Sequence, residues 1–245
     1  GVQRLNISLD TLRPERFAAM TRCGSLADVL AGIRAAEEAG FTQLKLDTVL
    51  IGGFNDDEIP ELVEAIPESC FEGCQSLAQV RMHGNVSTIG RRAFCYSGLG
   101  ELDLPSAVTE IGESAFESCD SLRIVRVPTK CALEVIGKNA FAGSAIEAFA
   151  FPSRVRKVCQ GAFYDCQRLA SVSLNKDLTT LGSDEDDDAR GVFEKSGLQE
   201  VLLPQKMQEI KRSAFRECGY LRAVKLPASI AFLGEFCFQG SGVTS

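Results

Sequence analysis

The chain has 245 residues, of which 45% are hydrophobic and 24% charged, a composition typical of a globular protein rather than a disordered or fibrous one. Its 33 acidic and 26 basic side chains leave a net charge of −7, which argues against general binding to nucleic acid or to anionic membranes. The single histidine, His83, excludes any mechanism that needs two imidazoles. No apolar run approaches the roughly 20 residues of a membrane helix, so we expect no membrane insertion.

Two strands and two helices alternate in the predicted structure of the N-terminal segment, residues 1–66. Apolar positions alternate over residues 4–9 and 43–51, as in strands. Residues 26–33 have helical spacing, and Gly40 ends that helix. Residues 56–66 predict a second helix, with acids in its first turn. This βαβα order indicates a piece of a parallel α/β sheet or TIM-like barrel.

The second helix is predicted to join the N-terminal segment to the rest of the chain as one rigid unit. Its apolar stripe consists of Ile59, Leu62, Val63 and Ile66. The helix runs into the next region without the polar linker that a flexible tether would have. We therefore expect the N-terminal segment to act as a cap on the remainder of the protein.

From Ile66 onward one phrase recurs at a nearly regular spacing: I-G-x-x-A-F, a small residue or Cys, then L-x-x-V-x-L-P. The opening apolar positions are Ile66, Ile89, Ile111, Ile136, Val158, Leu181, Ile210 and Leu233. The phenylalanines are Phe71, Phe94, Phe116, Phe141, Phe163, Phe193, Phe215 and Phe238. Eight copies at this period predict a solenoid, because no copy can bury its apolar side chains without a neighbour.

Each part of the phrase has a predicted structure. The L-x-x-V-x-L segment alternates as a short strand of a parallel sheet, and the proline after it ends the strand. The Ile-Gly step turns the chain, and Ala-Phe begins a short helical turn whose Phe fills the interior.

Cysteine and serine alternate at the position three residues after each Phe. These residues are Cys74, Ser97, Cys119, Ser144, Cys166, Ser196, Cys218 and Ser241. Strands in a sheet lie about 4.8 Å apart, so cysteines two copies apart are near 10 Å, beyond the roughly 7 Å that a disulfide can bridge. We therefore expect buried free thiols. The other cysteines lack C-x-x-C spacing, so neither zinc nor a redox pair is indicated, and no cofactor is expected.

The repeated phrase resembles the BspA-type leucine-rich repeats over residues 66–245. The departures are a longer turn at residues 129–134 and an acidic insertion after Leu181. The resemblance implies a curved, right-handed solenoid that binds proteins or surfaces and catalyses nothing. No C-terminal cap is visible, so we expect the solenoid to continue or to assemble end to end. Free cysteines slightly favour an intracellular location, whereas the family is often found at the cell surface.

The N-terminal segment resembles molybdenum cofactor biosynthesis protein A, a radical S-adenosylmethionine (SAM) family that cyclises GTP. The resemblance rests on R-L-N-I-S-L-D-T-L at residues 4–12, P-E-R-F at 14–17, V-L-A-G-I at 29–33, A-G-F at 39–41, L-K-L-D-T-V at 44–49 and G-F-N-D-D-E-I at 53–59. It implies that Ser8 contacts SAM and that Lys45 contacts GTP, while Asp47 replaces the family's usual Asn. The family's C-x-x-x-C-x-x-C cluster motif has no match in this sequence, so we expect no catalysis.

A working surface is predicted on the outer face of the strands. Between the last two apolar positions of each strand lies an outward residue, which gives the column Arg81, Asp103, Arg126, Ala150, Ser173, Leu202 and Lys225. Two residues earlier is the column Gln79, Glu101, Ile124, Ala148, Ser171, Glu200 and Ala223. Charged ends around a small, uncharged middle suit a protein ligand; a plain solvated sheet is the alternative. The acidic run at 184–188 lacks the Gly and Glu of a calcium loop and indicates a solvated loop; a contact for a basic partner is the alternative.

These observations predict a domain boundary between residues 65 and 66 and a non-catalytic scaffold that binds one or more proteins. Two alternatives stay open. The chain could derive from the GTP-cyclising enzyme and keep part of its nucleotide- and SAM-binding barrel. It could also be a structural subunit of a larger assembly.

Overall fold

A computed structural model describes residues 4–8, 13–20, 25–38, 43–47, 65–82, 84–182 and 190–243. The chain divides into two compact units, Gly1–Val63 and Glu64–Ser245. Helices are described in the first unit, whereas the described elements of the second are short strands.

The N-terminal unit is a parallel strand pair joined through two helices. Its elements are β1 (Arg4–Ser8), α1 (Pro14–Met20), α2 (Leu26–Glu38) and β2 (Gln43–Asp47). The strands pair in parallel, from Arg4 opposite Gln43 to Ser8 opposite Asp47. The α/β character predicted for this segment is thereby confirmed, whereas closure into a barrel stays a prediction.

The two helices pack through a small apolar cluster. Phe17 of α1 and Leu26 of α2 are buried, with Val29 and Leu30 packed against them. Ser25 caps α2, because its Oγ accepts the Asp28 backbone N–H at 3.2 Å. Helix α1 was not predicted, although a proline at its first position is a common helix start.

The helix predicted over residues 56–66 is wrong at its end. Residues 56–64 lie outside the described part of the chain, but Ala65–Ile66 form strand β3 instead of a last helical turn. Ile66 pairs in parallel with Ile89, so its backbone belongs to the solenoid sheet. The cap that this helix was expected to make stays a prediction.

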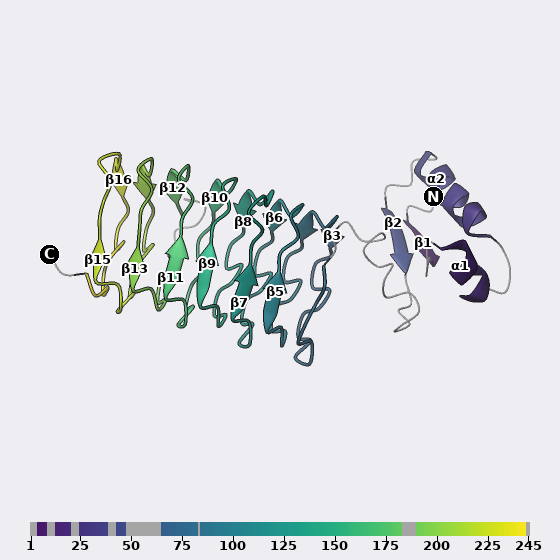
Figure 1. Cartoon of the computed structure of the whole chain (residues 1–245), viewed down its shortest axis with the longest axis horizontal. Helices are drawn as coiled ribbons and strands as arrows, with labels where there is room; N and C mark the ends of the chain where they lie inside the picture. The colour runs from purple at the N-terminus through teal and green to yellow at the C-terminus, as the bar shows by residue number, and fades with distance from the viewer. Residues whose placement is uncertain are drawn as a thin grey trace. The chain divides into compact units, whose positions relative to one another are not determined.

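The second unit is a solenoid whose repeats each contribute short parallel strands (Figure 1). The first sheet layer contains β3 (Ala65–Ile66), β4 (Thr88–Ile89), β6 (Glu110–Ile111), β8 (Val135–Ile136), β10 (Lys157–Val158), β12 (Thr180–Leu181), β14 (Glu209–Ile210) and β16 (Phe232–Leu233). The second contains β5 (Glu101–Asp103), β7 (Ile124–Arg126), β9 (Ala148–Ala150), β11 (Ser171–Ser173), β13 (Glu200–Val201) and β15 (Ala223–Val224). The second layer was predicted; the first was not, because its strands begin just before the Ile-Gly step that we interpreted only as a turn.

The eight phenylalanines form one ladder along the solenoid axis. Centroids of consecutive rings are 5.0 to 5.6 Å apart, and every consecutive pair is stacked. The six inner rings, from Phe94 to Phe215, have no exposed surface. The interior role predicted for these residues is confirmed.

The segment around each Phe is a pair of turns rather than the helical turn predicted. Ser114 and Ser118 have φ values of 53° and 54°, in the left-handed region that a right-handed helix cannot contain. The Ser118 N–H donates to the Ala142 carbonyl of the next repeat at 2.8 Å. The turn layer is therefore hydrogen bonded from repeat to repeat, as the strands are within each sheet.

The alternation of Cys and Ser pairs neighbouring repeats. Ser97 Oγ lies 3.5 Å from Cys119 Sγ, and the same pairing joins Ser144 to Cys166 and Ser196 to Cys218. Cys119 Sγ also donates to the Phe94 carbonyl at 3.0 Å. All cysteines in the described part of the chain are free, as predicted, and Cys119, Cys166 and Cys218 are buried. Cys74 is exposed. Among the described residues, no Ser of a preceding repeat lies against it.

Candidate interaction surface

The outward side chains of the second sheet layer form one exposed surface, called here the outer face. In β5 and β9 the middle residue is buried and the two flanking residues are exposed. Every residue of both predicted columns is exposed. The role of these residues as an interaction face stays a prediction. Gln79, Arg81, Leu202 and Lys225 lie outside the regular strands.

The outer face carries a cluster of three charged side chains at β5 and β7. Arg126 Nη1 lies 2.8 Å from Glu101 Oε2 and 3.2 Å from Asp103 Oδ1. The hydrogen bonds to these two carboxylates raise the pKa of Arg126 above its ordinary value. The Arg126 guanidinium is therefore paired with carboxylates of the same face. The three side chains together carry one net negative charge.

The middle of the outer face is small and uncharged. Ala148 and Ala150 of β9 lie beside Ser171 and Ser173 of β11, in parallel register. Farther along the solenoid, Leu202 is 81% exposed. This uncharged strip has the Arg126 cluster on one flank, and exposed Leu202 beside exposed Glu200 on the other. Such a surface has the character of a protein-binding surface.

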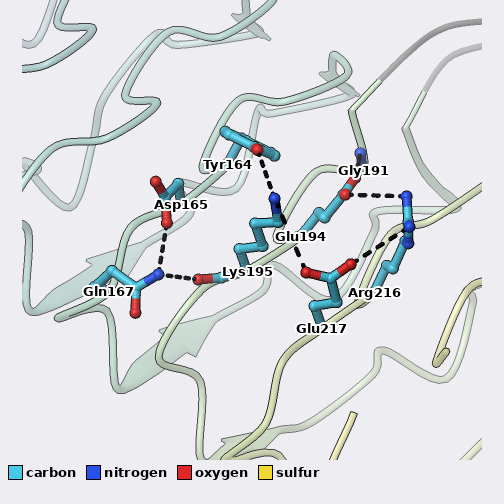
Figure 2. Close-up of polar contacts among 8 residues, drawn as sticks. All are labelled: Tyr164, Asp165, Gln167, Gly191, Glu194, Lys195, Arg216 and Glu217. Carbon is cyan, nitrogen blue, oxygen red and sulfur yellow. Dashed lines mark hydrogen bonds and ion pairs between the residues drawn. The ribbon is translucent and has the colours of Figure 1, made fainter. Parts of the chain in front are cut away.

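A polar network on the turn layer was missed by the sequence analysis (Figure 2). Lys195 Nζ donates to Tyr164 Oη at 3.1 Å, and Arg190 lies over the Tyr164 ring at 4.5 Å. The hydrogen bond to Tyr164 raises the pKa of Lys195. The sequence signal for this contact was the position of each residue relative to the ladder. Tyr164 follows Phe163 by one residue, and Lys195 follows Phe193, the next ladder residue, by two.

A second part of this network holds a buried carboxylate. Glu194 Oε2 accepts the Gly191 N–H at 2.8 Å, and Glu194 Oε1 lies 3.5 Å from Arg216 Nη1. Arg216 also lies 3.4 Å from Glu217. The Glu194–Arg216 contact joins successive repeats, so we interpret the network as structural.

The two residues predicted to contact ligands lie on neighbouring strands of the N-terminal unit. Ser8 ends β1 opposite Asp47, and Lys45 lies opposite Asn6. The carboxyl ends of parallel strands are where ligands bind in α/β sheets. The roles of Ser8 and Lys45 stay predictions.

Two further features singled out in the sequence fall outside the part of the chain that the structure describes. His83 and the acidic run at 184–188 lie outside the described residues. In the described part of the chain, no three His, Cys, Asp or Glu side chains are grouped so that they could hold a metal ion. The helices described for this chain include none long and apolar enough to cross a membrane.

The stacked parallel strands and the phenylalanine ladder define a leucine-rich-repeat solenoid. Comparison with known families matches a model of the BspA type leucine rich repeat region, in six copies, to residues 53–170 and 187–245. The chain belongs to the BspA-type leucine-rich-repeat family. A solved leucine-rich repeat protein from Bacteroides ovatus aligns with a TM-score of 0.65 and 29% identity, covering 74% of this chain and 45% of that one.

The N-terminal unit is similar to a different group of proteins. A model of the radical SAM superfamily matches residues 1–66. The GTP 3',8-cyclase of Peptoclostridium acidaminophilum is 60% identical over 63 residues, and that of Pseudomonas entomophila is 62% identical over 63 residues. Each match covers 26% of this chain and 19% of the cyclase. The chain thus spans about a fifth of the length of these curated relatives.

Proposed function

We propose that this protein is a non-catalytic scaffold whose outer face binds a protein partner. The observation that carries the proposal is the exposed strip of Ala148, Ala150, Ser171 and Ser173 between two flanks that carry charged side chains. Such a strip lets the partner's backbone approach the sheet closely, while the flanking residues fix its register.

The solenoid supports this role by its rigidity. Strand pairing is interrupted between β7 and β9 and between β10 and β12. The turn layer and the phenylalanine ladder continue across both breaks and connect each repeat to the next, so the outer face is preorganised before a partner arrives. A preorganised surface loses little conformational entropy on binding.

The test is a substitution that fills the strip, with a matched control elsewhere. The partner is first isolated by affinity capture with the full chain and identified by mass spectrometry. We then expect Ala148→Arg to weaken its binding at least about tenfold, because a buried unpaired charge costs more than a lost contact. Thr88→Arg, on β4 of the other sheet layer, should leave affinity unchanged. Equal affinity of wild type and Ala148→Arg would refute the proposal.

A second candidate function is residual binding of GTP or SAM by the N-terminal unit. The observation in its favour is the 60% identity to a GTP 3',8-cyclase over 63 residues. Titration of the full chain with each ligand separates this function from the scaffold role.

A further inference from the structure

A hollow opens at one edge of the solenoid where a turn is unusually long. The segment from Pro128 to the β8 residue Ile136 is two residues longer than the corresponding segment from Pro152 to Val158 in the next repeat. The extra residues leave a cavity of about 370 Å³, which is toward the small end of the range of about 300–1,000 Å³ for ligand sites. Its lining consists of Thr129, Lys130, Cys131, Ala132, Ser153 and Arg154.

The lining is cationic although the chain as a whole is acidic. It holds two positive side chains, Lys130 and Arg154, and no carboxylate. Neither cation lies within ion-pair distance of an acidic group in the described part of the chain. The hydroxyls of Thr129 and Ser153 add two further donors to the same hollow.

Backbone groups of both turns are also available. Cys131 N donates to Pro128 O at 3.1 Å and closes the first turn, as Val155 N does for Pro152 at 3.1 Å in the second. Inside the first turn, the backbone N–H of Lys130 has no hydrogen-bond partner among the described residues. The same holds for the N–H of Arg154.

A third turn of the solenoid provides a comparison. Lys206 follows Pro204 by two residues, as Lys130 follows Pro128 and Arg154 follows Pro152. Lys206 Nζ lies 2.6 Å from Asp177 Oδ1 of the preceding repeat. The cation two residues after the proline is thus paired with a carboxylate in the Lys206 turn. In the two turns that line the hollow, the corresponding cations have no carboxylate partner among the described residues.

We propose that this hollow binds a small molecule through its phosphate or sulfate group. A guanidinium, an ammonium, two hydroxyls and free backbone N–H groups together match the several acceptor oxygens of such an oxyanion. The limited volume selects a small molecule rather than a folded partner. The site shares no residue with the two columns of the outer face and lies in the turns that follow β7 and β9.

Calorimetry on the full chain tests the site with three probes: inorganic phosphate, glucose 6-phosphate and glucose 6-sulfate. We expect saturable binding that Lys130→Gln and Arg154→Gln each weaken at least about tenfold, as loss of a charge-assisted hydrogen bond does. Lys206→Gln is the matched control and should change nothing. Backbone amide shifts on titration should be largest at residues 129–132 and 153–154.

The two esters distinguish the sources of the oxyanion. Tighter binding of glucose 6-phosphate assigns a phosphate ester, and tighter binding of glucose 6-sulfate assigns a sulfate ester. Absence of saturable binding with all three probes would overturn the proposal. So would an equal loss in the Lys206→Gln protein, because the effect would then be one of overall charge.

Discussion

The N-terminal unit is 60% identical over 63 residues to a GTP 3',8-cyclase yet corresponds to 19% of that enzyme. The solenoid region, by contrast, aligns with a solved leucine-rich repeat protein at 29% identity, and that alignment covers 74% of this chain. An enzyme site assembles groups from distant parts of its fold, whereas each repeat is stabilised by its neighbours. The high sequence identity of the short N-terminal segment is therefore weak evidence for an enzyme function. The lower identity across the repeats is stronger evidence, but for structure.

The largest expected effect concerns the ladder that makes the solenoid cooperative. Phe163 is fully buried between Phe141 and Phe193, so Phe163→Ala should lower the free energy of unfolding by about 3–5 kcal/mol. Phe238 is partly exposed and has only Phe215 as a ladder neighbour, so Phe238→Ala should cost much less. Urea unfolding followed by circular dichroism measures both. Equal losses would mean that a further neighbour covers Phe238.

The buried thiols should make the solenoid sensitive to alkali. Burial raises the pKa of Cys119 and Cys218 to about 11 and that of Cys166 to about 12. The folded state therefore retains these protons at a pH where the unfolded chain loses them. Stability should fall above about pH 9, with a slope of about 1.4 kcal/mol per pH unit for each thiol.

A Cys→Ser variant at these three positions isolates the thiol contribution. Serine keeps a donor at each site but does not ionise in this range. Urea titrations between about pH 8 and about pH 10 should show a shallower loss of stability in the variant. Parallel curves for wild type and variant would mean that other groups cause the alkaline loss.

A smaller effect is expected at the first turn of the solenoid. Arg92 and Ser69 hydrogen bond to the carboxylate of Glu72 and lower its pKa to about 2. Because the folded pKa is depressed, the pair stabilises the protein above the ordinary Glu pKa, and this contribution disappears as pH falls toward 2. Glu72→Gln should be slightly less stable than wild type near neutral pH, and the two urea midpoints should converge in acid. A constant difference would exclude ionisation as the cause.

No effect is expected when the full chain is titrated with GTP or SAM, because the N-terminal unit corresponds to about a fifth of a cyclase. Calorimetry with an intact GTP 3',8-cyclase as positive control measures this. Saturable heat that is lost on Ser8→Ala or Lys45→Ala would instead assign the ligand function to the N-terminal unit.

The sequence predicted those features that one repeat contains within itself. The ladder positions, such as Phe116, and the outward columns, such as Glu101 and Asp103, follow from the spacing of apolar residues and from strand alternation. The free thiols follow from strand separation.

Features that depend on two-residue elements or on neighbouring repeats were not predictable in this way. Strand β4 is two residues long and has no periodicity to detect. Tyr164 and Lys195 are 31 residues apart in sequence and meet only after stacking. The hydrogen bond between Ser97 and Cys119 likewise needs the register between repeats, although the alternation itself was visible.

Hydrogen–deuterium exchange of the full chain, with and without its captured partner, tests the central claim most directly. Slow exchange of amides reports protection by the partner residue by residue. The scaffold account predicts new protection over the second sheet layer, at residues 101–103, 124–126, 148–150 and 171–173. Protection confined to residues 4–47 would contradict it and place the binding function in the N-terminal unit.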